Sequence, residues 1–247
     1  MIITSVNNDL VKETAKLLKN KYREESGLFL IEGEKAVKEA LDANLSIERI
    51  FIQDGLEGFG HKNLITTTEA VLSKISEAKS APKVVAVAKA PKYSFSELKD
   101  AKKVVLLEGI KDAGNLGTIL RTAVAFNIDA IILFGDTVDL YNPKCVRSAV
   151  GNLWKIPVIS SKDLNEILKY FSNFEKIATL PKSENVVNLN NYKPAEKTLI
   201  MFGSEADGLS QELKKIATKN ITIEMSSTVE SLNLSVSVAL IMYKMMF

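Results

Sequence analysis

The stretch VVLLEGIKDAGNLGTILRTA, residues 104–123, joins an apolar run to an apolar-periodic segment through a glycine-containing turn. The run predicts a buried strand, and the periodic segment predicts a helix over residues 114–126. The turn lacks the third glycine of the dinucleotide fingerprint G-x-G-x-x-G, and no Gly-Lys-Ser/Thr of a phosphate-binding loop follows it. We therefore expect Gly114 and Gly117 to serve a purpose other than cradling a pyrophosphate.

The same alternation of strand and helix continues to the end of the chain. Such a pattern predicts a parallel sheet with crossover helices, an α/β fold. The expected strands cover residues 104–108, 129–134, 176–180, 198–202 and 220–225, and the expected helices 114–126, 143–150, 162–171, 208–216 and 231–246.

The first 91 residues predict a smaller mixed α/β domain, and the polar stretch 90–103 predicts a linker with one proline. We expect one domain over residues 1–91 and another over 101–247. The expected helices of the first cover residues 9–22, 34–44 and 67–76, and the expected strands 28–33, 47–52 and 83–89.

The composition argues against a membrane-spanning protein and a zinc protein, and it does not decide whether the chain binds nucleic acid. The 247 residues are 46% hydrophobic, with a formal net charge of +2, so global charge does not indicate a nucleic-acid partner. No apolar run is long enough to span a membrane, and we expect no signal peptide. The single Cys145 indicates a reducing compartment, hence a cytoplasmic protein, and the single His61 argues against a zinc site, so we expect no metal.

Three polar, glycine-containing segments follow predicted strands in the second half of the chain. They are NLGTILR at 115–121, IMFGSEADGLS at 200–210 and IEMSSTVESLNLSVSVALIMY at 223–243. Ligands of open α/β sheets bind at the carboxyl ends of the strands. The three segments therefore predict one shared site.

In this order, the three segments resemble the SpoU (TrmH-type) branch of the SPOUT RNA methyltransferases. The segment 139–158 is similar to the one that these enzymes carry after the first motif, and residues 6–41 are more loosely similar to the substrate-binding extension of the ribosomal-RNA members. The resemblance implies a C-terminal SPOUT domain with a parallel sheet and a trefoil knot, an exception to the rule that chains avoid threading. It also implies a smaller N-terminal α/β domain, ribosomal-protein L30-like or L7Ae-like, and a homodimer.

The resemblance further implies S-adenosylmethionine as cofactor and assigns residues to the site. The backbone of Gly203, Ile223 and Leu232 would hold the cofactor, with Met225 lining its pocket. The catalytic residues carried over from the family are Arg121, Asn115, Glu205, Ser231 and Asn233. Methyl transfer to a ribose hydroxyl requires orientation and stabilisation of developing negative charge, which suits Arg121 better than a general-base role, because a guanidinium stays protonated.

Local clusters of basic residues are the candidates for RNA contact. Lys12, Lys16 and Lys19 share one helix face, with Arg23 just beyond, and Lys144 and Arg147 flank another helix start. Each cluster is equally compatible with a solvated surface. Both interpretations stay open at the level of the sequence.

These observations favour a methyltransferase acting on a ribose 2'-hydroxyl, in large-subunit ribosomal RNA. The alternatives are a tRNA methyltransferase and a catalytically silent RNA-binding or ribosome-assembly protein; a Rossmann oxidoreductase is disfavoured by the missing third glycine. The chain departs from the family pattern at Ala113, Glu224 and Ser227. The last two put the geometry of the cofactor loop in question.

Overall fold

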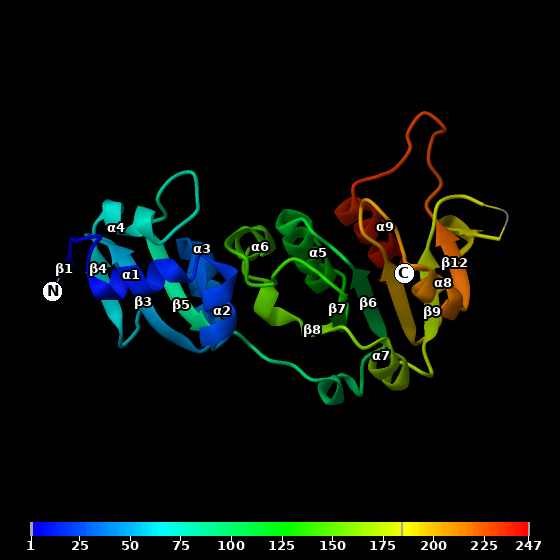
Figure 1. Cartoon of the computed structure of the whole chain (residues 1–247), viewed down its shortest axis with the longest axis horizontal. Helices are drawn as coiled ribbons and strands as arrows, with labels where there is room; N and C mark the ends of the chain where they lie inside the picture. The colour runs from blue at the N-terminus through cyan, green and yellow to red at the C-terminus, as the bar shows by residue number, and fades with distance from the viewer. Residues whose placement is uncertain (1, 184, 247) are drawn as a thin grey trace. The chain divides into compact units, whose positions relative to one another are not determined.

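The structure, a computed structural model, describes residues 2–183 and 185–246 (Figure 1). It divides into two compact units. The first consists of Met1–Pro91 together with Asp139–Lys155, and the second of Lys92–Val138 and Ile156–Phe247. The segment 139–155, which the sequence assigns to the second domain, therefore belongs by its contacts to the first unit.

The first unit is built on a mixed five-stranded sheet in the order β1-β4-β3-β5-β2. β1, β4 and β3 run parallel, and β5 pairs antiparallel with both β3 and β2. Its core includes Val11, Leu30, Phe51, Leu72 and Val85. The strands are β1 (Ile2–Ile3), β2 (Leu28–Glu32), β3 (Ile47–Gln53), β4 (Leu64–Thr67) and β5 (Val84–Lys89), and the helices of the first 91 residues are α1 (Asp9–Lys16), α2 (Asn20–Ser26), α3 (Glu34–Asp42) and α4 (Glu69–Lys74).

The helix expected over residues 9–22 is divided into α1 and α2. Asn8 caps α1 by accepting from Leu10 N, and Lys19 is extended, with φ −100° and ψ 135°. The break has a local cause. Arg23 Nη1 donates a 2.7 Å hydrogen bond to Leu17 O, so a buried guanidinium satisfies a carbonyl that the end of α1 leaves without an intrahelical partner.

Helix α6 (Pro143–Ala149) packs on β2 of the first unit. Asn142 caps this helix, and Pro143 occupies its first position. A backbone N–H at that position would have no acceptor within the helix, so proline loses no hydrogen bond there. Cys145, Val146 and Ala149 are buried. Sequence periodicity identified the helix but not the sheet that it covers.

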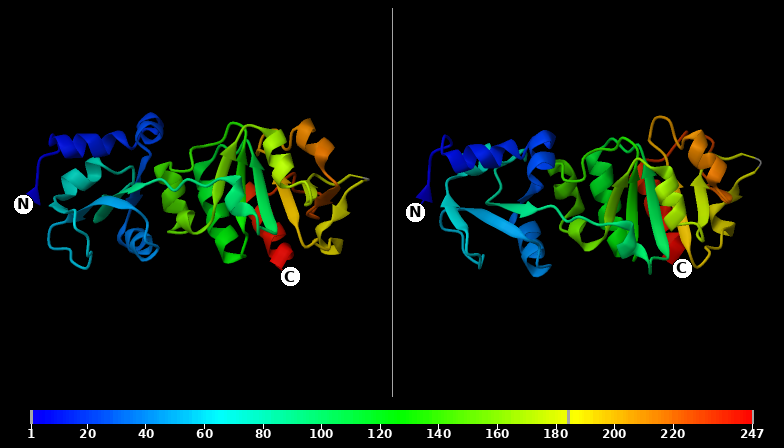
Figure 2. Two further views of the ribbon diagram at one scale, coloured as in Figure 1. Left: turned by 90° about the horizontal axis from the view of Figure 1, so that it is seen from below. Right: turned by 60° about the horizontal axis from the view of Figure 1, so that its bottom comes forward.

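The second unit is a seven-stranded sheet in the order β10-β12-β9-β11-β6-β7-β8, with all pairs parallel. α7 and α8 cover one face, and α5 and α9 pack together on the other (Figure 2). The sheet is buried on both faces, which explains the nearly continuous apolar strands. The elements are β6 (Lys103–Glu108), α5 (Ala113–Ala125), β7 (Ala130–Phe134), β8 (Val158–Ser161), α7 (Leu164–Tyr170), β9 (Glu175–Thr179), β10 (Val187–Asn188), β11 (Thr198–Phe202), α8 (Gln211–Ile216), β12 (Lys219–Thr222) and α9 (Leu234–Met246).

The expected linker is partly ordered onto the second unit. Residues Phe95–Leu98 form a short 3-10 helix, η1, closed by a capping box between Ser94 and Glu97. Phe95 and Leu98 are buried in the core beneath α7 and α8. The burial of these two residues could not be predicted from the sequence, because two apolar residues three positions apart in a polar segment form no recognisable pattern.

Two parts of the expected fold are confirmed: a parallel-sheet α/β domain and a smaller N-terminal α/β domain. The trefoil knot and the L30-like or L7Ae-like character of the first domain stay predictions. Among the described residues, none of the helices combines the length and the apolar character needed to cross a membrane.

Candidate functional site

Three loops of the second unit meet through a chain of side-chain hydrogen bonds. Asn115, at the start of α5, donates from Nδ2 to Glu205 Oε1 at 2.7 Å. Asn233, just before α9, donates from Nδ2 to Asn115 Oδ1 at 3.1 Å. The three segments that the sequence singled out therefore lie side by side, tied through Asn115.

The start of each flanking helix is fixed by a short polar side chain. Asp112 caps α5 by accepting from Asn115 N at 2.7 Å. Asn233 Oδ1 accepts from both the backbone N–H (2.9 Å) and the hydroxyl (2.6 Å) of Ser235. Asn233, and not Ser231, thus caps α9, and Ser231 lies exposed ahead of the helix.

Gly203 allows the second loop to close on itself. A Cβ at this position would lie 1.9 Å from the carbonyl carbon of Gly208, and Ser204 bridges back to Gly208, which adopts φ +65°. Gly203 has no room for a side chain because of the Gly208 backbone, and Gly208 has a positive φ that favours glycine. This tight turn carries Glu205 toward Asn115.

A cavity of about 390 Å³ lies among these loops, at the carboxyl ends of β9, β11 and β12. All four predicted cofactor residues line it: Gly203, Ile223, Met225 and Leu232. So do three of the predicted catalytic residues, Glu205, Ser231 and Asn233. Its volume is in the range of small-molecule pockets, about 300–1,000 Å³.

Part of the lining of this cavity was not predicted from the sequence. Thr179, Leu180 and Pro181, which follow β9, line it, and so do Ser237 and Ile241 of α9. The position of residues 179–181 directly after a predicted parallel strand was a signal for them. No feature of the sequence indicates that Ile241 lines the cavity, because its position there depends on how α9 packs.

The departure from the family pattern at Glu224 does not alter the cavity wall. Glu224 Oε2 accepts a 2.6 Å hydrogen bond from Asn188 Nδ2, and Oε1 lies 3.6 Å from Lys182 Nζ. Its neighbours Ile223 and Met225 line the cavity, whereas Glu224 does not. The side chain is therefore held outside the cavity.

Arg121 lies two turns into α5 and is exposed. Across residues 2–183 and 185–246, it has no hydrogen bond or ion pair. Its guanidinium donors are all available to a ligand, which distinguishes it from the buried or paired arginines of the first unit.

Two of the predicted RNA contacts form ion pairs within the first unit. Arg23 is 5% exposed, and its Nε and Nη2 both lie 2.6 Å from Asp139 Oδ2. Arg147 Nη1 lies 3.0 Å from both carboxylate oxygens of Glu32, a buried residue that also accepts from Ser76. These guanidinium groups fix α6 within the first unit. Arg23 is too buried to contact RNA, whereas Arg147, whose side chain is 31% exposed, stays a prediction of RNA contact.

The remaining basic candidates are exposed. Lys12 lies 3.7 Å from Asp9, and the Lys16 ammonium lies 5.7 Å from the centre of the Tyr22 ring. Lys19 and Lys144 are exposed as well. All four stay predictions of RNA contact.

Comparisons with known proteins agree across both units. Residues 102–243 match the family described as SpoU rRNA Methylase family, and residues 8–86 match the MRM3-like substrate binding domain. The chain is 30% identical to the 23S rRNA (guanosine(2553)-2'-O)-methyltransferase RlmP of Bacillus subtilis, covering 98% of this chain and 97% of that protein.

Solved structures give the same result. An AdoMet-bound rRNA methyltransferase from Sinorhizobium meliloti matches with a TM-score of 0.87 and 25% identity, covering 99% of this chain and 97% of that one. A structure described as an RNA 2'-O ribose methyltransferase matches with a TM-score of 0.82 and 30% identity, covering 99% of this chain and 98% of that one.

Proposed function

The chain belongs to the SpoU rRNA methylase family, and on that premise we propose that it transfers a methyl group from S-adenosylmethionine to a ribose 2'-hydroxyl of large-subunit ribosomal RNA. The observation that carries the proposal is the Glu205–Asn115–Asn233 chain of hydrogen bonds beside the 390 Å³ cavity. It supports the expectation that three motif loops form a single reaction centre.

The cavity suits S-adenosylmethionine. Apolar side chains, including Leu180, Phe202 and Ile241, can enclose an adenine ring, and loop backbone after three strands offers hydrogen-bonding groups. Two carboxylates, Glu205 and Glu230, line the same cavity and can offset a positive ligand charge. When bound, the cofactor supplies an electrophilic methyl group.

The residues around the cavity hold the reactants in place. Glu205 and Asn233 fix both ends of the Asn115 amide, so Asn115 presents its second N–H in one orientation. Arg121 offers a planar fork of donors that binds a phosphate or stabilises the alkoxide developing on the ribose oxygen. In-line transfer depends on this positioning.

A homodimer belongs to the same proposal. Val236, Leu240 and Met246 of α9 are exposed apolar residues, at 46%, 43% and 38%. Val236 and Leu240, together with Phe126, line a largely apolar groove of about 360 Å³ between α5 and α9. A second copy of the chain on this face would bury a patch that monomers rarely expose. Since Arg121 lies on α5, the interface would lie next to the reaction centre.

The test is methyl transfer from labelled S-adenosylmethionine to separated cellular RNAs, with mapping of the modified nucleotide. We expect label in large-subunit ribosomal RNA, at an alkali-resistant phosphodiester, because 2'-O-methylation removes the nucleophile of alkaline cleavage. Label in tRNA alone would select the alternative substrate. Cofactor and RNA binding without transfer would identify a silent RNA-binding protein. A ribosomal substrate and the buried Cys145 both fit a cytoplasmic location.

A further inference from the structure

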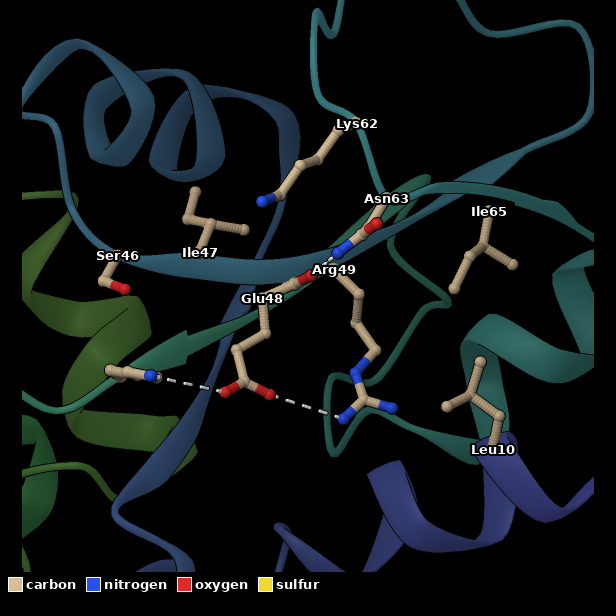
Figure 3. Close-up of a pocket in the computed structure, with 9 residues that line it drawn as sticks. Leu10, Ser46, Ile47, Glu48, Arg49, Lys62, Asn63 and Ile65 are labelled. Carbon is tan, nitrogen blue, oxygen red and sulfur yellow. Dashed lines mark hydrogen bonds and ion pairs between the residues drawn. The ribbon is translucent and has the colours of Figure 1, made fainter.

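A second cavity, of about 600 Å³, lies on the first unit at the starts of β3 and β4 and the end of β5. Three cations line it: Arg49, Lys62 and Lys89. Three apolar residues, Leu10, Ile47 and Ile65, line it as well (Figure 3). None of the cations belongs to the basic clusters that the sequence pointed to.

A β-bulge shapes one wall of this groove. The register between β3 and β5 shifts between Ile47 and Arg49, so Glu48 is an extra residue in the ladder. As a result, the consecutive side chains of Glu48 and Arg49 extend from the same side of β3 (Figure 3). Bulges re-aim side chains in this way and are frequent next to binding sites.

The loop before β4 holds the bulge in place. Asn63 Nδ2 donates to Glu48 O at 2.7 Å, and the His61 ring nitrogen Nε2 lies 3.2 Å from Ile47 O. Asn63 N donates to the other ring nitrogen, Nδ1, at 3.2 Å, which fits a neutral ring that donates from Nε2. The carbonyls that the bulge frees are therefore satisfied, and the groove is preformed.

The charges of the groove favour an anionic ligand. Glu48 lies 3.6 Å from Arg49 and 3.9 Å from Lys89, while Lys62 has no ion pair with any described residue. Three cations against one carboxylate leave the groove positive. Glu48 and Arg49 are half-buried, whereas Lys89 is exposed, and an ion pair with an exposed partner is weak, about 0–1 kcal/mol. A phosphate can therefore replace Glu48 as the partner of Lys89 at little cost.

We propose that this groove binds an unpaired nucleotide of the RNA substrate. Lys62 and Lys89 take the phosphate, and the base lies against Leu10 and Ile65, with the Arg49 guanidinium available for stacking. The identification of RNA as the ligand rests on the proposed function. The shape and charge of the groove indicate an anionic ligand independently of that function.

The test measures binding of the full-length protein to a fluorescent single-stranded oligouridylate. We expect the K62Q/K89Q double variant to bind about tenfold more weakly at low salt, and its salt slope to fall by about one to two, because each lost phosphate contact releases one counterion fewer. The matched control is K74Q/K79Q, which removes two exposed lysines from the α4 region and should bind within twofold of wild type. E48Q should bind more tightly, since it removes the competitor of the phosphate.

Two further arms separate the alternatives. Inorganic polyphosphate of equal charge should bind more weakly than the oligonucleotide, and Leu10→Ala should weaken only the oligonucleotide. Equal binding of both probes would overturn the base subsite, and equal RNA affinity in the groove and control variants would overturn the proposal. Loss of RNA affinity in K62Q/K89Q, in a protein whose wild type methylates no RNA, would refute the proposed function but uphold the groove.

Discussion

Asn115 Nδ2 donates a 2.7 Å hydrogen bond to Glu205 Oε1, although the two residues are 90 positions apart. Asn115 also accepts from Asn233, so one amide joins three loops at the carboxyl edge of the sheet. A side chain fixed at both ends cannot rotate to accommodate a change in either partner. The geometry of the centre therefore depends on the amide itself.

Asn115→Asp replaces this donor with a carboxylate facing Glu205. We expect methyl transfer to fall at least 10- to 100-fold, because a charge-assisted hydrogen bond worth about 1.5–3 kcal/mol becomes a repulsion. The control is Asn127→Asp, the same change at an exposed residue with φ 51° just after α5, which should leave activity unchanged. Equal rates for the two variants would show that the amide does not organise the centre.

Arg121→Ala should reduce methyl transfer by about 10²–10³, as removal of one preorganised charge-stabilising donor does. The melting temperature should stay the same, because Arg121 is exposed and makes no hydrogen bond or ion pair within the described residues. Arg121→Lys should also reduce methyl transfer, because a single ammonium group cannot form the paired hydrogen bonds of a planar guanidinium. Lys169→Ala, a charge removal on α7, is the control. A fall in stability that matches the fall in rate would make Arg121 structural.

Leu240→Glu places a charge in the exposed apolar face of α9. We expect a monomer by sedimentation, because a carboxylate cannot be buried there without a partner. The control is Val187→Glu on β10, where the apolar side chain is similarly exposed, at 39% against 43% for Leu240. A dimer that persists in Leu240→Glu would place the interface elsewhere.

The two subunits of such a dimer share a centre if Arg121 serves the partner's cavity. Mixing Arg121→Ala with Gly203→Ala then restores part of the activity, since one of the mixed sites is intact. Alanine suffices at Gly203, because its Cβ would lie 1.9 Å from the Gly208 backbone. Mixed dimers without activity would confine each centre to one subunit.

Arg147→Ala should destabilise the protein by about 3–5 kcal/mol, because it leaves the buried Glu32 carboxylate without a cation. Lys155→Ala breaks a pair with the more exposed Glu39 and should have little effect. Urea denaturation measures both changes. The double variant Glu32→Leu/Arg147→Met should recover much of the loss, since it removes both charges. Lower RNA affinity at unchanged stability would identify Arg147 as an RNA contact and not as a structural residue.

Five strands and the helices α5, α7, α8 and α9 of the second unit were predicted from the sequence, because long apolar runs followed by polar glycine turns leave few interpretations. The strands β8 and β10 were not predicted, because they are only four and two residues long. It also predicted which loops form the site, since the carboxyl ends of parallel strands share one edge. It did not predict that α6 packs on β2. That packing depends on the pairs of Arg23 with Asp139 and of Arg147 with Glu32, which join residues more than 100 positions apart.

The groove of the first unit escaped the sequence analysis for a similar reason. Arg49, Lys62 and Lys89 are scattered along the chain and form no charge run. The pairing of β3 with β5 and with β4, together with the bulge at Glu48, brings them together. Conversely, Arg23 looked like part of a basic run but is buried. Spacing along a helix does not reveal a partner contributed by a distant segment.

Cys145 should resist thiol reagents in the folded protein. It is fully buried on α6, and burial, with a smaller contribution from the Asp139 carboxylate, raises the pKa of its thiol above the ordinary value. Since the thiolate is the reactive form, both the raised pKa and the lack of access slow the reaction. We expect Ellman's reagent to label the native protein far more slowly than the protein in urea. Because labelling then reports the opening of α6, Arg147→Ala should accelerate it at a denaturant concentration where Lys155→Ala does not. Full-rate labelling of the native wild type would contradict the packing of α6 against β2.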